Sequence, residues 1–427
     1  YREMLAGRGL TSTTDLLVEA CKRTVETGML PHTNAGILSK EEMARLRPWN
    51  ASMGLMLETT SRRLREKGMP HFHAPDKEPA TRIKMHEEAG ELKIPFTTGM
   101  LLGIGENDSE RVDTLLTIRD LALRYHHIQE AIIQPFHPKP DTKMRDVASL
   151  SDELVVGWVA LARLIIPAEV HVQAPPNLGR GMLPKLLRAG VDDWGGVSPV
   201  TIDFINPEAP WPALRQLRDE TAAAGFELHE RGPVYPDWIL DRPDFFDPQM
   251  RALLPKYAND EGYAQRKTTS PTRRPLDMSE RNNEARNRGS YSVSADVRGL
   301  LEGVKAGAEL SAKDAERLLV AEGPDFHALI AAADLARFED CGDDVSYVVC
   351  RNINFTNICY VGCSFCGFAR HKDDPVDAYD RTHDEIIAKC RDAVERGATE
   401  VCIQGGIHPS KTHEHYRDIL LAVKAAY

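Results

Sequence analysis

Three cysteines near the C-terminal end of the sequence have the spacing of metal ligands. Cys359, Cys363 and Cys366 lie in the segment NICYVGCSFCGFAR and form a C-x3-C-x2-C pattern. Thiolates bind soft or borderline metals, and structural zinc requires four ligands in a closed tetrahedron. Because this loop offers three close thiols, we interpret it as the holder of a [4Fe–4S] cluster whose fourth iron stays open to another ligand. A zinc loop and cysteines that fill a core are the alternatives.

A second group of candidate residues lies in the first half of the sequence. Glu58 follows an apolar segment and could accept a hydrogen bond from a ligand hydroxyl, with a salt-bridged surface residue as the alternative. The stretch TTGMLLGIGE contains Gly99, Gly103 and Glu106. A strand loosened by glycine and followed by a helix-capping Glu is the alternative interpretation of that stretch.

The cysteine loop must be positioned by the elements around it. Residues 345–355 (VSYVVCRNINF) predict a strand that runs directly into the loop, and residues 400–407 (EVCIQGGI) predict a second strand. Thr382 and Glu385 predict the N-terminus of the helix between them. Residues 296–338 predict further helices, with Ser311 and Asp314 as a cap. Two β/α units are too few to close a barrel.

The first 255 residues alternate between strand-like and helix-like segments. Ser39 with Glu42 and Asn107 with Glu110 predict helix N-termini. Regular alternation predicts parallel strands in a TIM-type (β/α) barrel, whose active site lies at the C-terminal strand ends. Gln134 and His137 fall at such an end, although a lone His is more often structural. The predicted strands are 29–38, 51–58, 94–104, 130–137, 169–175 and 196–205.

The composition divides the chain into three parts. Residues 256–294 are almost free of apolar side chains and predict a flexible linker. We therefore predict domains at 1–255 and 295–427. The first residue is Tyr1 rather than Met, and the last residues stop within a helical pattern, which we interpret as a piece of a longer protein.

The bulk properties exclude several classes of protein. The net charge of the 427 residues is −11, which argues against a nucleic-acid partner because phosphate binding requires a basic face. No apolar run approaches the roughly 20 residues that span a bilayer. Seven of the eight cysteines lie in the last quarter of the chain. A secreted protein held together by disulfides would have its cysteines spread more evenly, so this distribution favours a reducing cytoplasm.

The cysteine loop, with Phe365 just before its last Cys, resembles the signature of radical S-adenosylmethionine (SAM) enzymes. The resemblance implies that Cys359, Cys363 and Cys366 hold the cluster and that Phe365 shields it. It also implies a Gly-Gly-Glu turn after the second strand, where this sequence has Gly405, Gly406 and Ile407. These two glycines would seat the methionyl group of SAM, and a side-chain role at the third position is lost. In the first region, the nucleoside would be lined by Glu58, Gly99, Gly103 and Glu106.

The order of motifs resembles the bifunctional deazaflavin synthases of coenzyme F420 biosynthesis, in which two radical SAM barrels are fused. The stretches that carry this resemblance include NASMGLMLE, KGMPHFHAPDK, IIQPFHPKPDTKM and CIQGGIHP. It implies strands three to eight of one barrel in the first region and the first two β/α units of another in the second region. The cysteine loop and Glu58 would then belong to different active sites.

The same resemblance implies substrates and a reducing electron donor. The second barrel would couple a 4-hydroxybenzyl radical from L-tyrosine to 5-amino-6-(D-ribitylamino)uracil, and the first would cyclise the adduct with loss of ammonia. Three alternatives stay open. They are another radical SAM enzyme of menaquinone- or thiazole-pathway type, a non-catalytic metal-binding protein, and one circularly permuted barrel.

Overall fold

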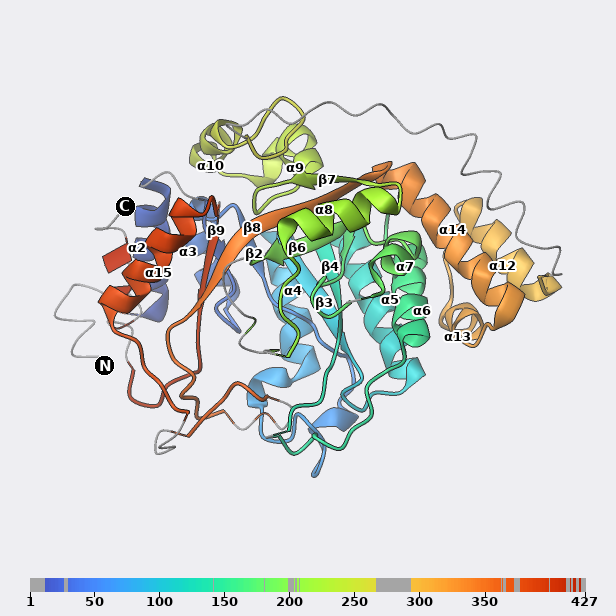
Figure 1. Ribbon diagram of the computed structural model, residues 1–427, viewed down its shortest axis with the longest axis horizontal. Coiled ribbons are helices and arrows are strands. Elements are labelled where there is room, and N and C mark those ends of the chain that lie inside the picture. Colours follow the sequence, from blue (N-terminus) through green and yellow to red (C-terminus); the bar gives the residue numbers. More distant parts are fainter. Residues whose placement is uncertain are drawn as a thin grey trace.

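The computed structural model shows a parallel sheet with helices packed on its outer face (Figure 1). Phe365 and most of the predicted linker lie outside the residues that the structure describes. Those described residues are 12–26, 30–140, 142–179, 181–198, 203, 206, 208–265, 293–361, 363, 366–371, 377–398, 400–411, 415, 418–419 and 422–423.

The described strands are all parallel and form one sheet in the order β1-β2-β3-β4-β5-β6-β8-β7, with β9 beside β8. Among the described residues, no pairing joins β1 to β7 or β9, so the sheet is an incomplete TIM-type barrel, as predicted. The strands are β1 (His32–Thr33), β2 (Ser52–Gly54), β3 (Phe96–Leu102), β4 (Ile128–Pro135), β5 (His171–Gln173), β6 (Asp193–Val197), β7 (Glu227–Glu230), β8 (Asp344–Asn354) and β9 (Glu400–Gln404).

Two strands differ from the sequence-based prediction. β6 overlaps the predicted 196–205 by two residues only, because it begins at Asp193, whose buried carboxylate is paired with Arg231. β7 was not predicted, since its sequence ELHE has three polar residues and no apolar run. It is stabilised by its pairing with β8 rather than by its own pattern.

The predicted helix starts are confirmed. Ser39 with Glu42, Asn107 with Glu110, Ser311 with Asp314 and Thr382 with Glu385 each form a reciprocal capping box, which satisfies backbone N–H groups of the first turn. The helices are α2 (Thr13–Glu26), α3 (Lys40–Leu46), α4 (Pro79–Glu91), α5 (Asp108–Tyr125), α6 (Asp152–Ile165), α7 (Leu183–Arg188), α8 (Leu214–Ala223), α9 (Pro236–Asp241), α10 (Pro248–Leu253), α12 (Ala295–Lys305), α13 (Ala312–Leu319), α14 (Gly323–Cys341) and α15 (His383–Glu395).

The helices of the second region form an additional outer layer. α13 packs on α5 and α6, and α14 packs on α6 and α7, at the right of Figure 1. α15 packs on β8 instead. The main core therefore runs through both regions and includes Val159 of α6, Leu329 of α14 and Val349 of β8.

The strands of the two predicted barrels share one sheet, a pairing that the prediction of two barrels did not include. β8 lies between β6 and β7, with Gly196 opposite Val348. An open edge strand presents unpaired N–H and C=O groups, and β8 satisfies those of β6. The division into domains at 256–294 stays a prediction, because most of that segment lies outside the described residues.

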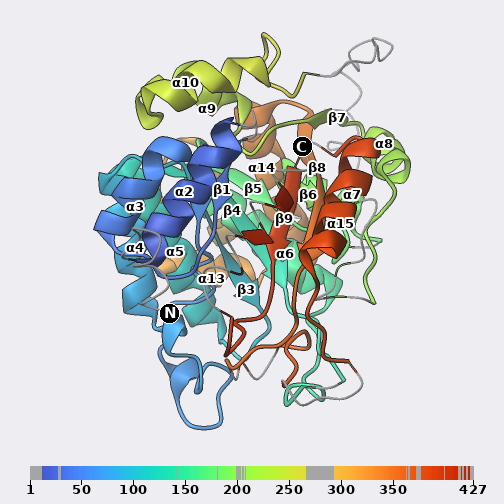
Figure 2. The ribbon, with the colours of Figure 1, turned by 90° about the vertical axis from the view of Figure 1, so that its left-hand side faces the viewer.

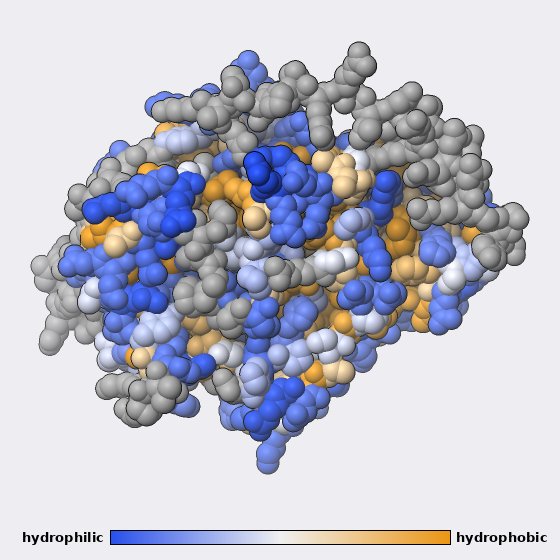
Figure 3. Space-filling view, viewed as in Figure 1, coloured by the Kyte–Doolittle hydropathy of each residue, from blue (hydrophilic) through white to orange (hydrophobic). Residues whose placement is uncertain are grey.

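The surface in Figure 3 is mostly hydrophilic, with apolar residues in separate patches between polar ones. Among the described helices, none combines the length and the apolar character needed to cross a bilayer.

Candidate functional site

The loops that follow the C-terminal ends of β2, β3, β4 and β8 gather at one end of the sheet. They form the lower part of the molecule in Figure 1, and Figure 2 shows the orange and red loops beside the blue ones. This is the end at which a (β/α) barrel carries its active site. The candidate residues of both halves of the sequence therefore lie at a common mouth.

The cysteine loop leaves β8 and folds back on itself. The Cys359 N–H donates to the Arg370 carbonyl at 3.1 Å, and the Arg370 N–H donates to the Asn357 carbonyl at 2.8 Å. At the tip, the Cys366 N–H donates to the Cys363 carbonyl at 3.2 Å. All three cysteines are half-buried and unoxidised. The two backbone hydrogen bonds at its base thus close a short loop that carries three free thiols.

Gly405 and Gly406 pack directly against the base of this loop. A Cβ atom on Gly405 would lie 2.9 Å from the Thr356 carbonyl oxygen, and one on Gly406 would lie 2.4 Å from that of Ile358. The Gly406 N–H also donates to the Thr356 carbonyl at 2.8 Å. The close approach of β9 to the loop therefore requires glycine at both positions, whether or not a ligand is bound.

The surroundings of Cys363 disfavour a free thiolate. Burial raises the pKa of the Cys363 thiol to about 11, although the ammonium group of Lys77 acts in the opposite direction. Asp76 and Glu58 also raise it, which places the loop within electrostatic reach of the first-region site. A metal that replaces the thiol proton would supply the missing positive charge.

Glu58 is held at this mouth in a strained backbone conformation. Its φ of 65° lies in the left-handed region, which is uncommon outside glycine and clusters at functional sites. The Glu58 N–H donates to the Gly99 carbonyl at 2.9 Å, and the Leu101 N–H donates to the Glu58 carbonyl at 3.0 Å. Two backbone hydrogen bonds to β3 therefore fix the position of this residue.

The side chain of Glu58 lies beside two cations and beside His71, whose pKa burial lowers to about 4. It forms an ion pair with Lys77, while Arg82 Nη1 lies 3.4 Å from Oε1 and His71 Nε2 lies 3.5 Å from Oε2. Burial alone would raise the pKa of Glu58, but Lys77 and Arg82 outweigh it and the pKa is lowered. Oε2 is buried and accepts no hydrogen bond from any described residue. The ionised carboxylate thus keeps one acceptor available for a ligand.

Glu106 supports the turn after β3 with one carboxylate oxygen and leaves the other without a hydrogen-bond partner among the described residues. Its Oε1 accepts hydrogen bonds from the Gly103 N–H and from Arg111 Nε, the latter at 2.8 Å. Gly103 has a φ of +93°, a conformation that glycine adopts readily. Oε2 is buried and has no hydrogen-bond partner among the described residues. Glu106 therefore stabilises the turn after β3 and still offers an oxygen, whereas the predicted helix cap is provided by Asn107 with Glu110.

Gly99 and the residues of β4 complete the mouth. A Cβ on Gly99 would lie 2.2 Å from the Ile132 carbonyl oxygen, so glycine allows β3 and β4 to pair here. Gln134 is half-buried at the end of β4. Burial and then Lys139 lower the pKa of His137, and its Nε2 is buried without a hydrogen bond from the described residues.

Sequence reasoning missed several basic residues of this mouth. His71 and Lys77 lie in KGMPHFHAPDK, and Arg82 lies in α4. Lys139 donates to Asn206 Oδ1 at 2.7 Å, and a Cβ on Gly367 would lie 2.6 Å from its Cγ. Apart from Arg82, these basic residues come from loops and short turns, where periodicity gives no signal. KGMPHFHAPDK was nevertheless among the stretches that carried the family resemblance.

The residues of the mouth fit an iron–sulfur cluster and SAM. The cysteine loop supplies soft thiol donors. In a [4Fe–4S] cluster each cysteine thiolate binds a different iron atom, so the three sulfur atoms can lie farther apart than they would around a single metal ion. Glu58 and Glu106 supply buried carboxylate oxygens without hydrogen-bond partners among the described residues, which could receive hydroxyl or ammonium groups. These donors are of the types that suit both groups.

Comparison with known proteins agrees with this site. The model of the radical SAM superfamily matches residues 353–426, which contain the cysteine loop and β9. The fold and the site thus define a radical SAM protein. FO synthase of Streptomyces coelicolor is 41% identical over 464 residues, and the match covers 99% of this chain and 53% of that protein.

Two further relatives extend the comparison. FO synthase of Mycobacterium tuberculosis is 41% identical over 468 residues, which cover 99% of this chain and 54% of that protein. The 7,8-didemethyl-8-hydroxy-5-deazariboflavin synthase of Methanopyrus kandleri is 48% identical over 263 residues, which cover 61% of this chain and 78% of that protein. The chain belongs to the FO synthase family, and it spans about half the length of the longer relatives.

Proposed function

We propose that this chain carries parts of both halves of a bifunctional FO synthase, which makes 7,8-didemethyl-8-hydroxy-5-deazariboflavin (FO). The observation that carries the proposal is the match to FO synthases over 99% of the chain at 41% identity. One match over this length requires the same order of motifs, from the Glu58 segment to the cysteine loop. A radical SAM enzyme of another pathway would not be expected to preserve both regions and their order.

The half that contains residues 295–427 would act as a transferase on L-tyrosine and 5-amino-6-(D-ribitylamino)uracil. Its reaction would cleave the tyrosine Cα–Cβ bond and join the 4-hydroxybenzyl group to the pyrimidine. The half that contains residues 1–255 would act as a lyase, which oxidises this adduct and closes the deazaflavin ring with loss of ammonia. A low-potential electron donor would supply the electrons for both halves.

Each half would contribute defined contacts. Cys359, Cys363 and Cys366 would ligate the [4Fe–4S] cluster, which with bound SAM supplies the 5′-deoxyadenosyl radical. Phe365 would shield the cluster from water. The backbone of Gly405 and Gly406 would seat the methionyl group. In the other half, Gly99 and Gly103 would allow close approach of the nucleoside.

The carboxylates of that half would hold the nucleoside in place. Oε2 of Glu58 would accept a ribose hydroxyl, supported by the cations around Oε1. Oε2 of Glu106 would accept a second donor of the same ligand. Their shared task is to orient the ligand and exclude water, because the difficult chemistry belongs to the cofactor.

The two halves would belong to separate barrels, with residues 256–294 as the linker. The 263-residue match to the Methanopyrus kandleri synthase is about as long as the first region, which supports such a unit. In this chain both barrels are incomplete, and their open edges would pair as β6 and β8 do.

Eight free cysteines and a cluster that needs reducing conditions support a cytoplasmic site of action.

The proposal is tested by replacing the matching segment of the Streptomyces coelicolor FO synthase with this chain, which completes both barrels, and assaying the chimaera anaerobically. The assay contains SAM, a strong one-electron reductant, L-tyrosine and 5-amino-6-(D-ribitylamino)uracil. We expect the 4-hydroxybenzyl adduct or FO, with 5′-deoxyadenosine as co-product, by mass spectrometry. The matched control is Cys363→Ala, which should yield neither product. Formation of 5′-deoxyadenosine with a different acceptor and never with this pyrimidine would point to another radical SAM reaction.

A further inference from the structure

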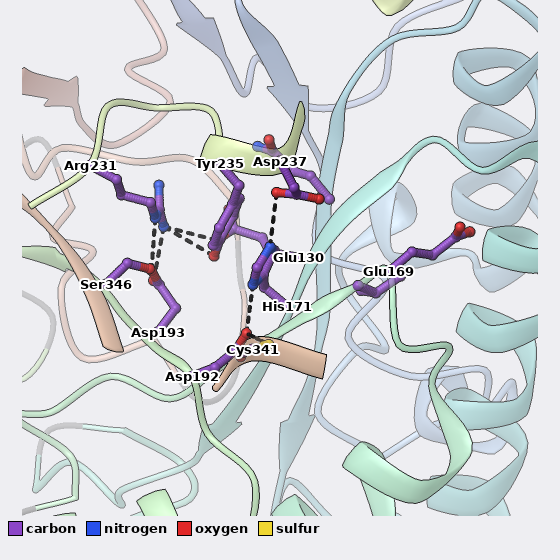
Figure 4. A network of polar contacts seen from close by, with 12 residues as sticks. Glu130, Glu169, His171, Asp192, Asp193, Arg231, Tyr235, Asp237, Cys341 and Ser346 are labelled. Carbon is purple, nitrogen blue, oxygen red and sulfur yellow. Dashed lines mark hydrogen bonds and ion pairs between the residues drawn. The ribbon is translucent and has the colours of Figure 1, made fainter. Parts of the chain in front are cut away.

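A cavity of about 430 Å³ lies at the N-terminal ends of the strands, away from the cysteine loop. Three elements that are distant in sequence meet there. His171 begins β5, Asp192 lies just before β6, and Cys341 is the last residue of α14. Figure 4 shows these three side chains pointing toward one another. None of them has a role in the proposed reaction.

The three side chains place different ligand atoms close together. His171 Nδ1 lies 2.5 Å from Asp192 Oδ2, and Cys341 Sγ lies 3.0 Å from the same oxygen. Among the described residues, this is the group of His, Cys, Asp or Glu whose ligand atoms all lie within 4.8 Å of one another. Nitrogen, oxygen and sulfur donors together are typical of zinc and similar divalent ions.

The surroundings hold Asp192 and His171 in the orientation of metal ligands. Asp192 Oδ1 accepts hydrogen bonds from Arg163 Nη2 and from the Val172 N–H, each at 2.7 Å, which leaves Oδ2 for the site. His171 Nε2 lies 3.2 Å from Asp237 Oδ1. A carboxylate on the far nitrogen is the contact by which proteins orient a metal-binding His.

The His171 ring is fixed from a third side. It stacks on Tyr235, with ring centroids 3.8 Å apart and planes 5° from parallel. The side chain of Asp192 is only 1% exposed, while that of His171 is 19% exposed, so the group is closed behind and open toward the cavity. A metal there would keep one coordination position for water or a ligand from the cavity.

The charges of the cavity suit a cation. Its lining includes Glu169, Asp237, Asp340 and Asp344 in addition to Asp192. Arg163 lies behind Asp192 and compensates part of this negative charge. A divalent ion would displace two protons to solvent, one shared between His171 and Asp192 and one from the Cys341 thiol. The net charge of the site then stays unchanged on binding.

We propose that His171, Asp192 and Cys341 form a binding site for a zinc-type divalent metal ion, with its fourth position open to the cavity. Without metal, the same residues form a buried hydrogen-bonded ion pair, which is the alternative. Binding of Zn²⁺ through the Cys341 thiolate distinguishes the metal site from the ion pair.

The test measures alkylation of Cys341 by iodoacetamide in the whole chain, with and without Zn²⁺, by peptide mass spectrometry. We expect saturating Zn²⁺ to slow alkylation of Cys341 at least tenfold, since a bound thiolate is protected. The peptides of Cys359, Cys363 and Cys366 are read separately, so zinc bound at the cysteine loop does not obscure the result. Unchanged alkylation of Cys341 would overturn the proposal.

Two further variants test the contributions of His171 and Asp237 to Zn²⁺ binding, so that the result does not depend on a single substitution. Asp237→Asn should weaken the protecting Zn²⁺ affinity by roughly 10- to 100-fold, as expected for a residue that orients a ligand. Asp241→Asn, exposed on the same helix, is the matched control and should leave the affinity unchanged. His171→Gln should abolish protection while far-UV circular dichroism shows the fold retained. Protection that persists in this variant would place the zinc elsewhere and refute the site.

Discussion

At the scale of single residues, Glu58 links the backbone to the proposed ligand. Its positive φ is stabilised by two hydrogen bonds to β3, and its carboxylate is held by Lys77 and Arg82. Such strain persists only where the surrounding structure overdetermines it. The strained backbone then holds Oε2 of Glu58 where it could accept a hydrogen bond from the ligand.

We predict that Glu58→Gln weakens SAM binding at the first-region site, measured without a cluster on the cysteine loop, by roughly 10- to 100-fold. The change removes a charged acceptor, which contributes about 1.5–3 kcal/mol, and a tenfold change in affinity corresponds to about 1.4 kcal/mol. Isothermal titration calorimetry measures the effect. Glu66→Gln, on an exposed residue of the same segment, is the control. A lowered unfolding temperature with unaltered SAM affinity would mean that Glu58 is purely structural.

The candidate residues of the mouth were partly predictable. Glu58 and Glu106 stood out because acidic residues after buried strands face the active end of a barrel. His71, Lys77 and Arg82 did not, because their convergence on one carboxylate depends on the path of an irregular loop. The His171, Asp192 and Cys341 group could not be predicted either, since its members come together only when α14 packs against the first region.

At the scale of elements, the N-terminus of α5 is supported by a polar cluster around Glu110. Its carboxylate accepts hydrogen bonds from Ser61, from Arg63 and from the Asn107 N–H. Burial acts to raise the pKa of Glu110, but these partners lower it to about 2, below its ordinary 4.5. A carboxyl group whose pKa is lower in the folded than in the unfolded state stabilises the fold when the pH is above the unfolded-state pKa. This stabilisation is lost as the pH falls toward the folded-state pKa.

We predict that Glu110→Gln lowers the free energy of unfolding by about 1–2 kcal/mol at pH 7, after allowance for partial solvent screening. The difference from the parent protein should be halved by about pH 3, because the parent carboxylate gains its proton there on unfolding. Urea unfolding at pH 7, 5, 4 and 3 measures this. Asp113→Asn, exposed on the same helix, should show no such dependence. A difference that stays constant with pH would contradict the assignment.

Elements with strong local signals were predicted best. Four capping boxes and the helices of 296–338 agree with the structure, because caps are read from a few neighbouring residues. β6 and β7 were mispredicted because pairing with β8 and the buried Arg231–Asp193 ion pair decide their positions. Those interactions are separated by many residues in sequence.

At the scale of the whole molecule, β8 joins the two regions into one sheet. The junction has polar as well as apolar contacts. Arg231, after β7, donates to Asp193 of β6 at 2.7 and 2.8 Å, and Ser346 of β8 donates to the same carboxylate. The β6–β8 contact was not expected, because sequence alone indicated two barrels and gave no information on how two open edges would pair.

We predict that Gly196→Cys forms a disulfide with the native Cys350 on mild oxidation of this chain. A Cβ at position 196 would lie 3.9 Å from Cys350 Cβ, within the usual 3.5–4.5 Å range of disulfides. Non-reducing peptide mass spectrometry detects the bond. Adding Cys350→Ser gives the matched control, which should show no bond. Two free thiols at these positions after oxidation would mean that β8 does not lie beside β6 in solution.

The central claim is that the cysteine loop holds a [4Fe–4S] cluster with one iron open to SAM. The most direct measurement is iron and acid-labile sulfide content after anaerobic reconstitution, with electron paramagnetic resonance of the reduced protein before and after SAM is added. We predict one cluster per chain, a spectrum that changes with SAM, and loss of the cluster in Cys363→Ala while circular dichroism shows the fold retained. One zinc per chain at this loop, or a cluster that survives Cys363→Ala, would contradict the account.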